Sequence, residues 1–395
     1  MCQCFHKFFC FAHHISNLDL IEILKGQWLG HFSGTYEGFI VINIDELHDN
    51  FKGCVYLIHN NDNIPNVFAI IQTSDKRNDF SFRTYSIAPI NPSTRFPDDW
   101  NNIKNSFDPN ARIAEFVDVT GSWDEKYLSL KWNTSLDGHG ECTLPRSQAE
   151  EPSNLKQNIK DWDIFKQDIG LLKGTRYLFR GQNKPWKLRS SFHRTGRADL
   201  TRFVNEDIPS LHKHLSARTK HVFNLDIPKE NGAFFNLVQH HGYPTPLLDW
   251  TYSPYVAVFF AFRSITSKMA ADSNDDEMVR IFVFDQHQWR SDYEQQLLLS
   301  TANLHLSIAD FIAIDNERLI PQQAATTVTN IDDIEAYIHL KEKENNKQYL
   351  SAIDIPISNR DKAIQELRYM GITAGSLFPG LDGACEELKD RNFEI

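Results

Sequence analysis

Residues 239–262 read Gln239-His-His-Gly-Tyr-Pro-Thr-Pro-Leu-Leu-Asp-Trp-Thr-Tyr-Ser-Pro-Tyr-Val-Ala-Val-Phe-Phe-Ala-Phe262. The glycine and two prolines of the first half predict a loop, and the apolar pair Leu247-Leu248 predicts the start of a buried strand. Ser253 followed by Pro254 predicts a helix N-cap with proline at the first helical position. The helix that follows is apolar on most faces and is therefore expected to be buried.

Four side chains fall between the predicted strand and the predicted helix: Asp249, Trp250, Thr251 and Ser253. Backbone N–H groups and small polar side chains converge where a strand ends and a helix begins, so such junctions are common sites in proteins that mix the two elements. This junction is therefore the first candidate site.

The length and composition of the chain limit the classes of protein to which it can belong. A chain of 395 residues is long enough for two domains, each with its own core. The formal net charge of −11 argues against sequence-independent nucleic-acid binding, which needs a basic face. No run of about 18 apolar residues and no signal-peptide pattern occurs, so we predict a cytoplasmic protein with no membrane partner.

Six cysteines are too few for a disulfide framework in a chain of this length. Three of them, Cys2, Cys4 and Cys10, lie in residues 1–25, which we treat as a separate N-terminal segment. Their spacing, together with the nearby histidines, does not match that of a zinc knuckle, so no metal site is predicted.

Residues 26–145 are predicted to form an all-β barrel or sandwich. Runs of β-formers are separated by turn residues such as Asp137-Gly138, which is the pattern of several short strands. We expect this domain to recognise an unknown macromolecular target or an activating ligand. The strand candidates are Phe39–Ile44, Cys54–Ile58, Val67–Gln72, Phe80–Ile87, Ile113–Val119 and Tyr127–Trp132.

Residues 146–156 are polar, contain a proline and are predicted to be the linker. Beyond them, residues 157–395 mix helical and strand patterns, which predicts an α+β domain. Two of its strand candidates bear on the site: Tyr177–Gln182, and Phe311–Ile314, which would lead into Glu317.

Four separated motifs carry a family resemblance. In chain order they are Phe179-Arg180-Gly181-Gln182, Gln239-His240-His241-Gly242, Leu247-Leu248-Asp249-Trp250-Thr251 and Ser376-Leu377-Phe378-Pro379. Through these motifs the chain resembles the FRG domain family over roughly residues 155–390. The family pattern has arginine after the Pro-Thr of the loop, where this chain has Pro246.

The order of these parts is also distantly similar to that of ADP-ribosyltransferases, which use NAD as a substrate. The resemblance implies that Arg180, within the segment Arg180-Gly181-Gln182, anchors the dinucleotide. A guanidinium on a rigid strand suits this role because it offers a planar, permanently charged donor fork to the pyrophosphate. Thr251 and Ser253 would then belong to the nicotinamide pocket, and Trp250 would form its aromatic wall.

The resemblance further implies a carboxylate that stabilises the positive charge developing as the ribosyl bond breaks. Glu317 stands near the expected position, and Gln323 after it lacks charge but could orient a ribose hydroxyl. Asp249 is the alternative carboxylate. His240 or His241 could act as an acid, a base or a hydrogen-bond donor near neutral pH.

Several of these residues also have a purely structural interpretation. Arg180 could form a buried ion pair with Asp249, and Asp249 could instead cap the helix that begins near Ser253. A group of nearby cations could form a phosphate-binding surface or a solvated face. These cations are Lys184, Lys187, Arg189, Arg194, Arg197 and Arg202.

The sequence therefore predicts an NAD-binding FRG-domain protein, an ADP-ribosyltransferase-like or NAD glycohydrolase effector with a β sensor domain. This layout suits a bacterial defence or toxin system. The alternative from another class is a non-catalytic module that binds a nucleotide or another phosphate-bearing ligand. A hydrolase built on Ser253, His241 and Asp249 lacks the Gly-x-Ser-x-Gly elbow that would support it.

Overall fold

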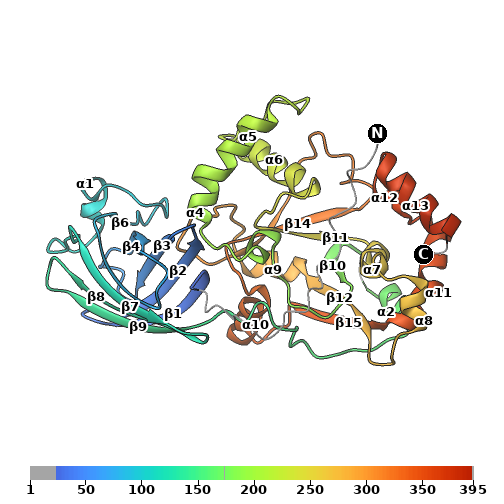
Figure 1. Ribbon diagram of the computed structural model, residues 1–395, viewed down its shortest axis with the longest axis horizontal. Coiled ribbons are helices and arrows are strands. Elements are labelled where there is room, and N and C mark those ends of the chain that lie inside the picture. The colour runs from blue at the N-terminus through green and yellow to red at the C-terminus, as the bar shows by residue number, and fades with distance from the viewer. Residues whose placement is uncertain (1–23, 173, 394–395) are drawn as a thin grey trace.

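The computed structural model describes residues 24–172 and 174–393, which form two β-sheets packed side by side (Figure 1). The first sheet is an N-terminal barrel, and the second belongs to a region that mixes helices with strands. The fold class predicted from the sequence is thus confirmed. Cys2, Cys4 and Cys10 lie outside the described residues.

The first sheet has nine strands in the described chain, all antiparallel and all within residues 26–145, in the order β5-β7-β8-β9-β1-β2-β3-β4-β6. β4 and β5 follow each other in the chain but lie near opposite edges of this order, so the sheet curls into a nearly closed barrel (Figure 1). Closure hides strand edges that could otherwise pair with other chains. The strands are β1 Gly26–Gly34, β2 Gly38–Glu46, β3 Phe51–His59, β4 Val67–Gln72, β5 Asp79–Thr84, β6 Ile87–Pro89, β7 Val117–Trp123, β8 Tyr127–Thr134 and β9 His139–Pro145.

Along β2 and β3 of the barrel, successive side chains point alternately into the barrel and toward the second region of the chain. Ile40 and Ile42 belong to the inner cluster of the barrel. Val41 and Tyr56 belong to a different cluster, which includes Ala302 of the second region. A shift of register by one residue would exchange these faces, so the barrel core and the domain contact require the same register.

The second sheet is antiparallel throughout, in the order β13-β14-β11-β10-β12-β15. Its strands are β10 Tyr177–Gln182, β11 Leu247–Thr251, β12 Met278–Asp285, β13 Leu306–Ala309, β14 Ala324–Thr329 and β15 Leu350–Pro356. The α-helices of the described chain are α1 Trp100–Ile103, α2 Trp162–Gly170, α3 Ser191–Arg194, α4 Leu200–Arg202, α5 Ile208–Leu215, α6 Pro228–His240, α7 Pro254–Phe262, α8 Ser267–Ala271, α9 Gln286–Asp292, α10 Ile334–Asn345, α11 Arg360–Tyr369, α12 Ala374–Leu377 and α13 Leu381–Phe393.

Helices cover both faces of the second sheet. Along β12, Ile281 and Val283 pack with α2, α7 and α11. The alternate residues Phe282 and Phe284 pack on the other face with α9 and α10. Every residue of β12 is buried, as expected for a strand inside a sheet that is covered on both sides.

Polar contacts join the barrel to the second region. Gln27 of β1 donates from Nε2 to the Asn330 carbonyl at 2.7 Å and accepts from the Asp332 N–H at 3.0 Å. Ser147 donates to the Asp332 carboxylate at 2.9 Å, so the predicted linker 146–156 contacts the second region at this point. Because buried polar groups must keep their partners, these bonds specify one arrangement of the two parts.

Two buried histidines near this contact make the stability of the fold depend on pH. Burial lowers the pKa of His193 and of His305 to about 4. Both are neutral in the folded protein, whereas the unfolded chain binds protons below about pH 6.5. Their contribution to the free energy of unfolding is therefore complete above pH 6.5. It is lost as the pH falls toward 4, by about 3 kcal/mol for each histidine. Burial raises the pKa of Asp199 to about 6, and its contribution has the opposite sign because it is lost as the pH rises from about 4 to 6.

We expect urea unfolding to give a lower free energy of unfolding at pH 4.5 than at pH 7, since two histidines outweigh one aspartate. His305→Gln should flatten this dependence, and Asp199→Asn should steepen it by removing the opposing carboxyl. Equal pH slopes for the wild type and both variants would contradict these assignments.

Within residues 24–172 and 174–393, no helix has the length and apolar character needed to cross a membrane.

Candidate functional site

The candidate site lies where strands β10 and β11 separate, near the middle of the second sheet (Figure 1). β10 pairs with β12 at every position from Tyr177 to Gln182. It pairs with β11 only at Phe179, which lies opposite Thr251. Beyond Phe179 the two strands do not pair, and the main-chain groups that face the separation need other partners.

Arg180 supplies one of these partners. Its Nη1 donates to the main-chain carbonyl of Asp249 at 2.5 Å, and its Nε is buried without a hydrogen-bond partner among the described residues. None of the described carboxylates forms an ion pair with it. Burial, together with the cation of Arg194, lowers the pKa of Arg180 to about 10, so the side chain remains charged at neutral pH. The site therefore holds a cation whose donors are only partly used.

The carboxylate of Asp249 is bound to α6, and through it to the loop that precedes β11. It accepts from the amide of Gln239, whose carbonyl accepts from the hydroxyl of the fully buried Thr245. The alternative of a side-chain ion pair between Arg180 and Asp249 is wrong, because Arg180 contacts the main chain of this residue. Asp249 does not cap α7 either, since the Ser253 hydroxyl accepts from the N–H of Val256 in the first turn of that helix.

His240 is the histidine that the fold brings to this site. Its Nδ1 lies 2.6 Å from Nδ2 of Asn316, and its carbonyl accepts from Nη1 of Arg318 at 2.8 Å. Burial lowers its pKa, Arg318 and His241 act in the same direction, and Asp249 opposes them. A neutral ring that accepts at Nδ1 carries its proton on Nε2 and can donate from there. His241 follows as the C-cap of α6 and is exposed.

The sequence did not predict Asn316 and Arg318 as site residues. They lie in an irregular loop, far along the chain from β10, and only the folded structure places them against α6. The only local signal was a run of polar residues after Ile314, which does not distinguish a site from an ordinary surface loop.

The two hydroxyls expected at the nicotinamide pocket are used by the fold itself. Thr251 donates to the Gln322 carbonyl at 2.7 Å and accepts from the N–H of Ser253 at 3.0 Å. Ser253 caps α7 by accepting from the N–H of Val256 at 3.3 Å. Both residues are buried, so their hydroxyls stabilise the strand-to-helix turn.

Gly181 is required by packing rather than by the approach of a cofactor. A Cβ at this position would lie 1.8 Å from the carbonyl oxygen of Ala257, in the main chain of α7. The glycine therefore lets the helix lie directly on β10. Gln182, the next residue, donates to the Trp186 carbonyl at 3.2 Å and fixes the turn after the strand.

Three further predicted site residues form no hydrogen bond with Arg180 in the described chain. Trp250 is not a pocket wall: its ring stacks on Phe284 in the core, and its indole N–H donates to Thr327. Glu317 is exposed in a loop, because the neighbouring strand is β13 and not the predicted strand over residues 311–314. Gln323 is also exposed and has a left-handed backbone with φ of 46°.

Most of the basic cluster is neutralised by the fold. Four of its members form ion pairs at 2.5–3.4 Å: Lys187 with Asp333, Arg189 with Asp332, and Arg197 and Arg202 with Asp45. The other two members, Lys184 and Arg194, form no ion pair in the described chain, and Nη1 of Arg194 donates to the Arg189 carbonyl. Arg180 and Arg194 are therefore neighbouring cations that form no ion pair with a described carboxylate, although the charge of Asp249 acts on both. The described residues contain no cluster of three or more His, Cys, Asp or Glu side chains that could hold a metal ion.

Comparison with known proteins gives one match. Neither the curated proteins nor the solved structures contain a significant match to the chain. Residues 175–270, which include β10, α6, β11 and α7, match the family model of the FRG domain. The protein therefore carries an FRG domain after its N-terminal β barrel.

Proposed function

We propose that the FRG domain binds NAD or a related nucleotide through Arg180. The observation that carries this proposal is the partly used guanidinium: Arg180 is charged, its Nε has no hydrogen-bond partner among the described residues, and neither it nor its neighbour Arg194 forms an ion pair with a described carboxylate. Two adjacent cations that form no ion pair in the described chain are suited to a pyrophosphate, which accepts several charge-assisted hydrogen bonds.

The proposed reaction is cleavage of the bond between nicotinamide and ribose, by an ADP-ribosyltransferase or NAD glycohydrolase mechanism. Asp249, whose main-chain carbonyl accepts from Arg180, is the predicted carboxylate, and its side chain would stabilise the oxocarbenium-like charge of the transition state. His240, whose pKa burial lowers, would assist the leaving group or the acceptor. The barrel, which packs against this domain, would act as the sensor or target-recognition part.

A second candidate is a nucleotide-binding module without catalysis. One observation favours it: the Asp249 carboxylate is already bonded to the Gln239 amide, and Glu317 is exposed in a loop. A carboxylate that accepts a hydrogen bond from an amide stabilises a developing cation less than a free one, so turnover could be lost while binding is kept.

NAD binding and nicotinamide release by the purified full-length protein test both candidates. We expect NAD to raise the melting temperature of the wild type. Arg180→Ala should weaken binding by about tenfold to a hundredfold, because charge-assisted hydrogen bonds to the phosphates are lost. Arg180→Lys should not restore binding fully, since an ammonium lacks the planar fork. Arg218→Ala, which removes an exposed cation, is the matched control.

Asp249→Asn separates catalysis from binding. If the domain is an enzyme, this variant should keep most of the NAD affinity and lose nicotinamide release. Binding without release in the wild type would support the second candidate. The absence of both NAD-induced stabilisation and nicotinamide release, in protein shown to be folded, would refute the proposal.

A further inference from the structure

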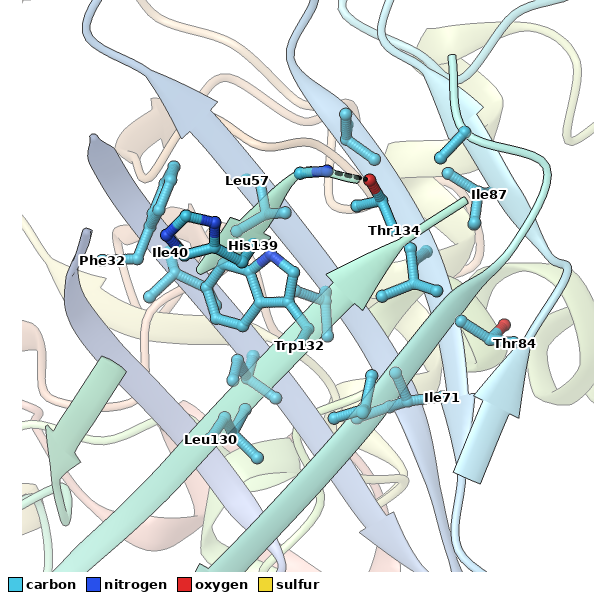
Figure 2. A pocket seen from close by; sticks show the side chains of 18 of the residues that line it. Phe32, Ile40, Leu57, Ile71, Thr84, Ile87, Leu130, Trp132, Thr134 and His139 are labelled. Atoms are coloured by element: carbon cyan, nitrogen blue, oxygen red, sulfur yellow. Dashed lines mark hydrogen bonds between the residues drawn. The ribbon is translucent and has the colours of Figure 1, made fainter. Parts of the chain in front are cut away.

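The barrel encloses a cavity of about 430 Å³. Figure 2 shows side chains from several strands pointing into this one space, among them Leu57, Ile71, Leu130 and Trp132. A volume of this size lies within the range of small-molecule sites, about 300–1,000 Å³. Barrels of about eight strands are either filled by their own side chains or hold one small ligand.

The two ends of the barrel differ in how they are packed. At one end Trp28, Phe51 and Trp123 are buried and fill the interior. Toward the other end Leu57 and Trp132 line the cavity but are only half-buried. Inward-facing apolar side chains that keep exposed surface are not packed against one another, so this part of the barrel is a cavity with an apolar wall.

The end of the cavity at which Leu57 and Trp132 keep exposed surface, which we call its mouth, also carries polar residues. Lys52, Gln72 and Thr73 line the opposite end. Thr35, His59 and His139 line the mouth, where β3 stops and β9 begins (Figure 2 labels His139). Arg112, in the loop before β7, lines the same end. Its Nη1 donates to the carbonyls of Pro109 and Ala111, and it forms no ion pair with a described carboxylate.

The charges of the side chains that line the cavity indicate which class of ligand it can bind. None of the described residues that line the cavity is Asp or Glu, although the chain as a whole has a net charge of −11. The charged side chains in the lining are Lys52 and Arg112. A cationic guest would therefore find no counter-charge, whereas an anionic group at the mouth would meet Arg112.

We propose that the barrel binds a small anionic amphiphile, with its apolar chain or ring system in the cavity and a carboxylate or similar head beside Arg112. This site is separate from the FRG domain and does not depend on the proposed NAD chemistry. The wall formed by β2 and β3 has the cavity on one face and the FRG-domain region on the other, so a ligand here is well placed to influence that domain.

Fluorescence titration of the full-length protein with 8-anilinonaphthalene-1-sulfonate tests the proposal, because this probe has an apolar body and an anionic group. We expect saturable binding and displacement of the probe by decanoate. Decanol, which lacks the charge, should displace it about tenfold less well, and decyltrimethylammonium less well again. Equal displacement by all three would refute the anionic head.

Two pairs of variants locate the site. Ala69→Phe adds a ring on the inner face of β4 and should abolish probe binding, whereas Ile70→Phe adds a ring on the exposed face of the same strand and should not. Arg112→Ala should weaken decanoate about tenfold and leave decanol unchanged, with the exposed Lys131→Ala as its control. Thermal unfolding shows whether each variant is folded. The proposal is wrong if no saturable binding occurs below about 1 mM, or if Ala69→Phe, while folded, binds the probe as the wild type does.

Discussion

Gly181→Ala should be among the most destabilising single substitutions in this protein, lowering the free energy of unfolding by about 3 kcal/mol or more. The added Cβ would lie 1.8 Å from the Ala257 carbonyl oxygen and 2.9 Å from the Ala261 nitrogen. Both atoms belong to the main chain of α7, so no side-chain rotation can relieve the overlap. The helix must move away from β10, and the large apolar core between them must open. Urea unfolding followed by circular dichroism measures the loss.

Gly170→Ala is the matched control, because a Cβ there meets no atom within 4 Å. Gly170 is the last residue of α2, and alanine should be neutral or slightly stabilising at this position. If Gly181→Ala lowered the free energy of unfolding by less than about 1 kcal/mol, α7 would be able to move away from β10 at little cost in stability. That result would contradict the packing explanation of this glycine.

The sequence predicted the elements around the site because their signals are local. The proline-rich loop, the pair Leu247-Leu248 and the Ser253-Pro254 cap correspond to β11 and to the start of α7. Tyr177–Gln182 is β10 with the expected bounds. Turn residues, caps and short apolar runs act within a few residues of themselves, so a single sequence is enough to read them.

The geometry of the site could not be predicted in the same way, because it depends on contacts between distant segments. The motif suggested that Gly181 serves a cofactor, but its neighbour is a helix some 75 residues later, and only the fold shows the contact. Trp250 has the composition of a pocket wall, but alternation along β11 directs it into the core. The separation of β10 from β11 leaves no mark in the sequence of either strand.

The contact between the barrel and the second region, which contains the FRG domain, predicts a second substitution with a large effect on stability. Asp45→Ala should lower the free energy of unfolding by about 3 kcal/mol or more. The Asp45 carboxylate lies at the end of β2 and is 1% exposed. It pairs with Arg197 at 2.7 Å and Arg202 at 3.4 Å, and it accepts from the N–H groups of Ala198 and Asp199. Truncation leaves the two buried N–H donors without their acceptor, and buried groups left unpaired are costly. It also removes one of two carboxylates from each arginine, since Arg197 keeps Asp207 and Arg202 keeps Glu206.

Asp118→Ala is the control that separates the effect of burial on stability from the effect of losing an ion pair. Asp118 also pairs with an arginine through two bonds, to Arg83 at 2.7 and 2.6 Å, but this pair lies on the exposed surface of the barrel. Solvent screening makes the net contribution of such pairs to stability close to zero, so no measurable change in the free energy of unfolding is expected.

Asp45→Asn should lower the free energy of unfolding by an amount between those of Asp118→Ala and Asp45→Ala, because an amide oxygen can still accept from both N–H groups but cannot neutralise Arg197. Since Asp45 and Arg197 lie in different domains, the loss should appear as separate unfolding of the barrel and the FRG-domain region. A single transition with an unchanged midpoint would show that the other interface bonds suffice to hold them together.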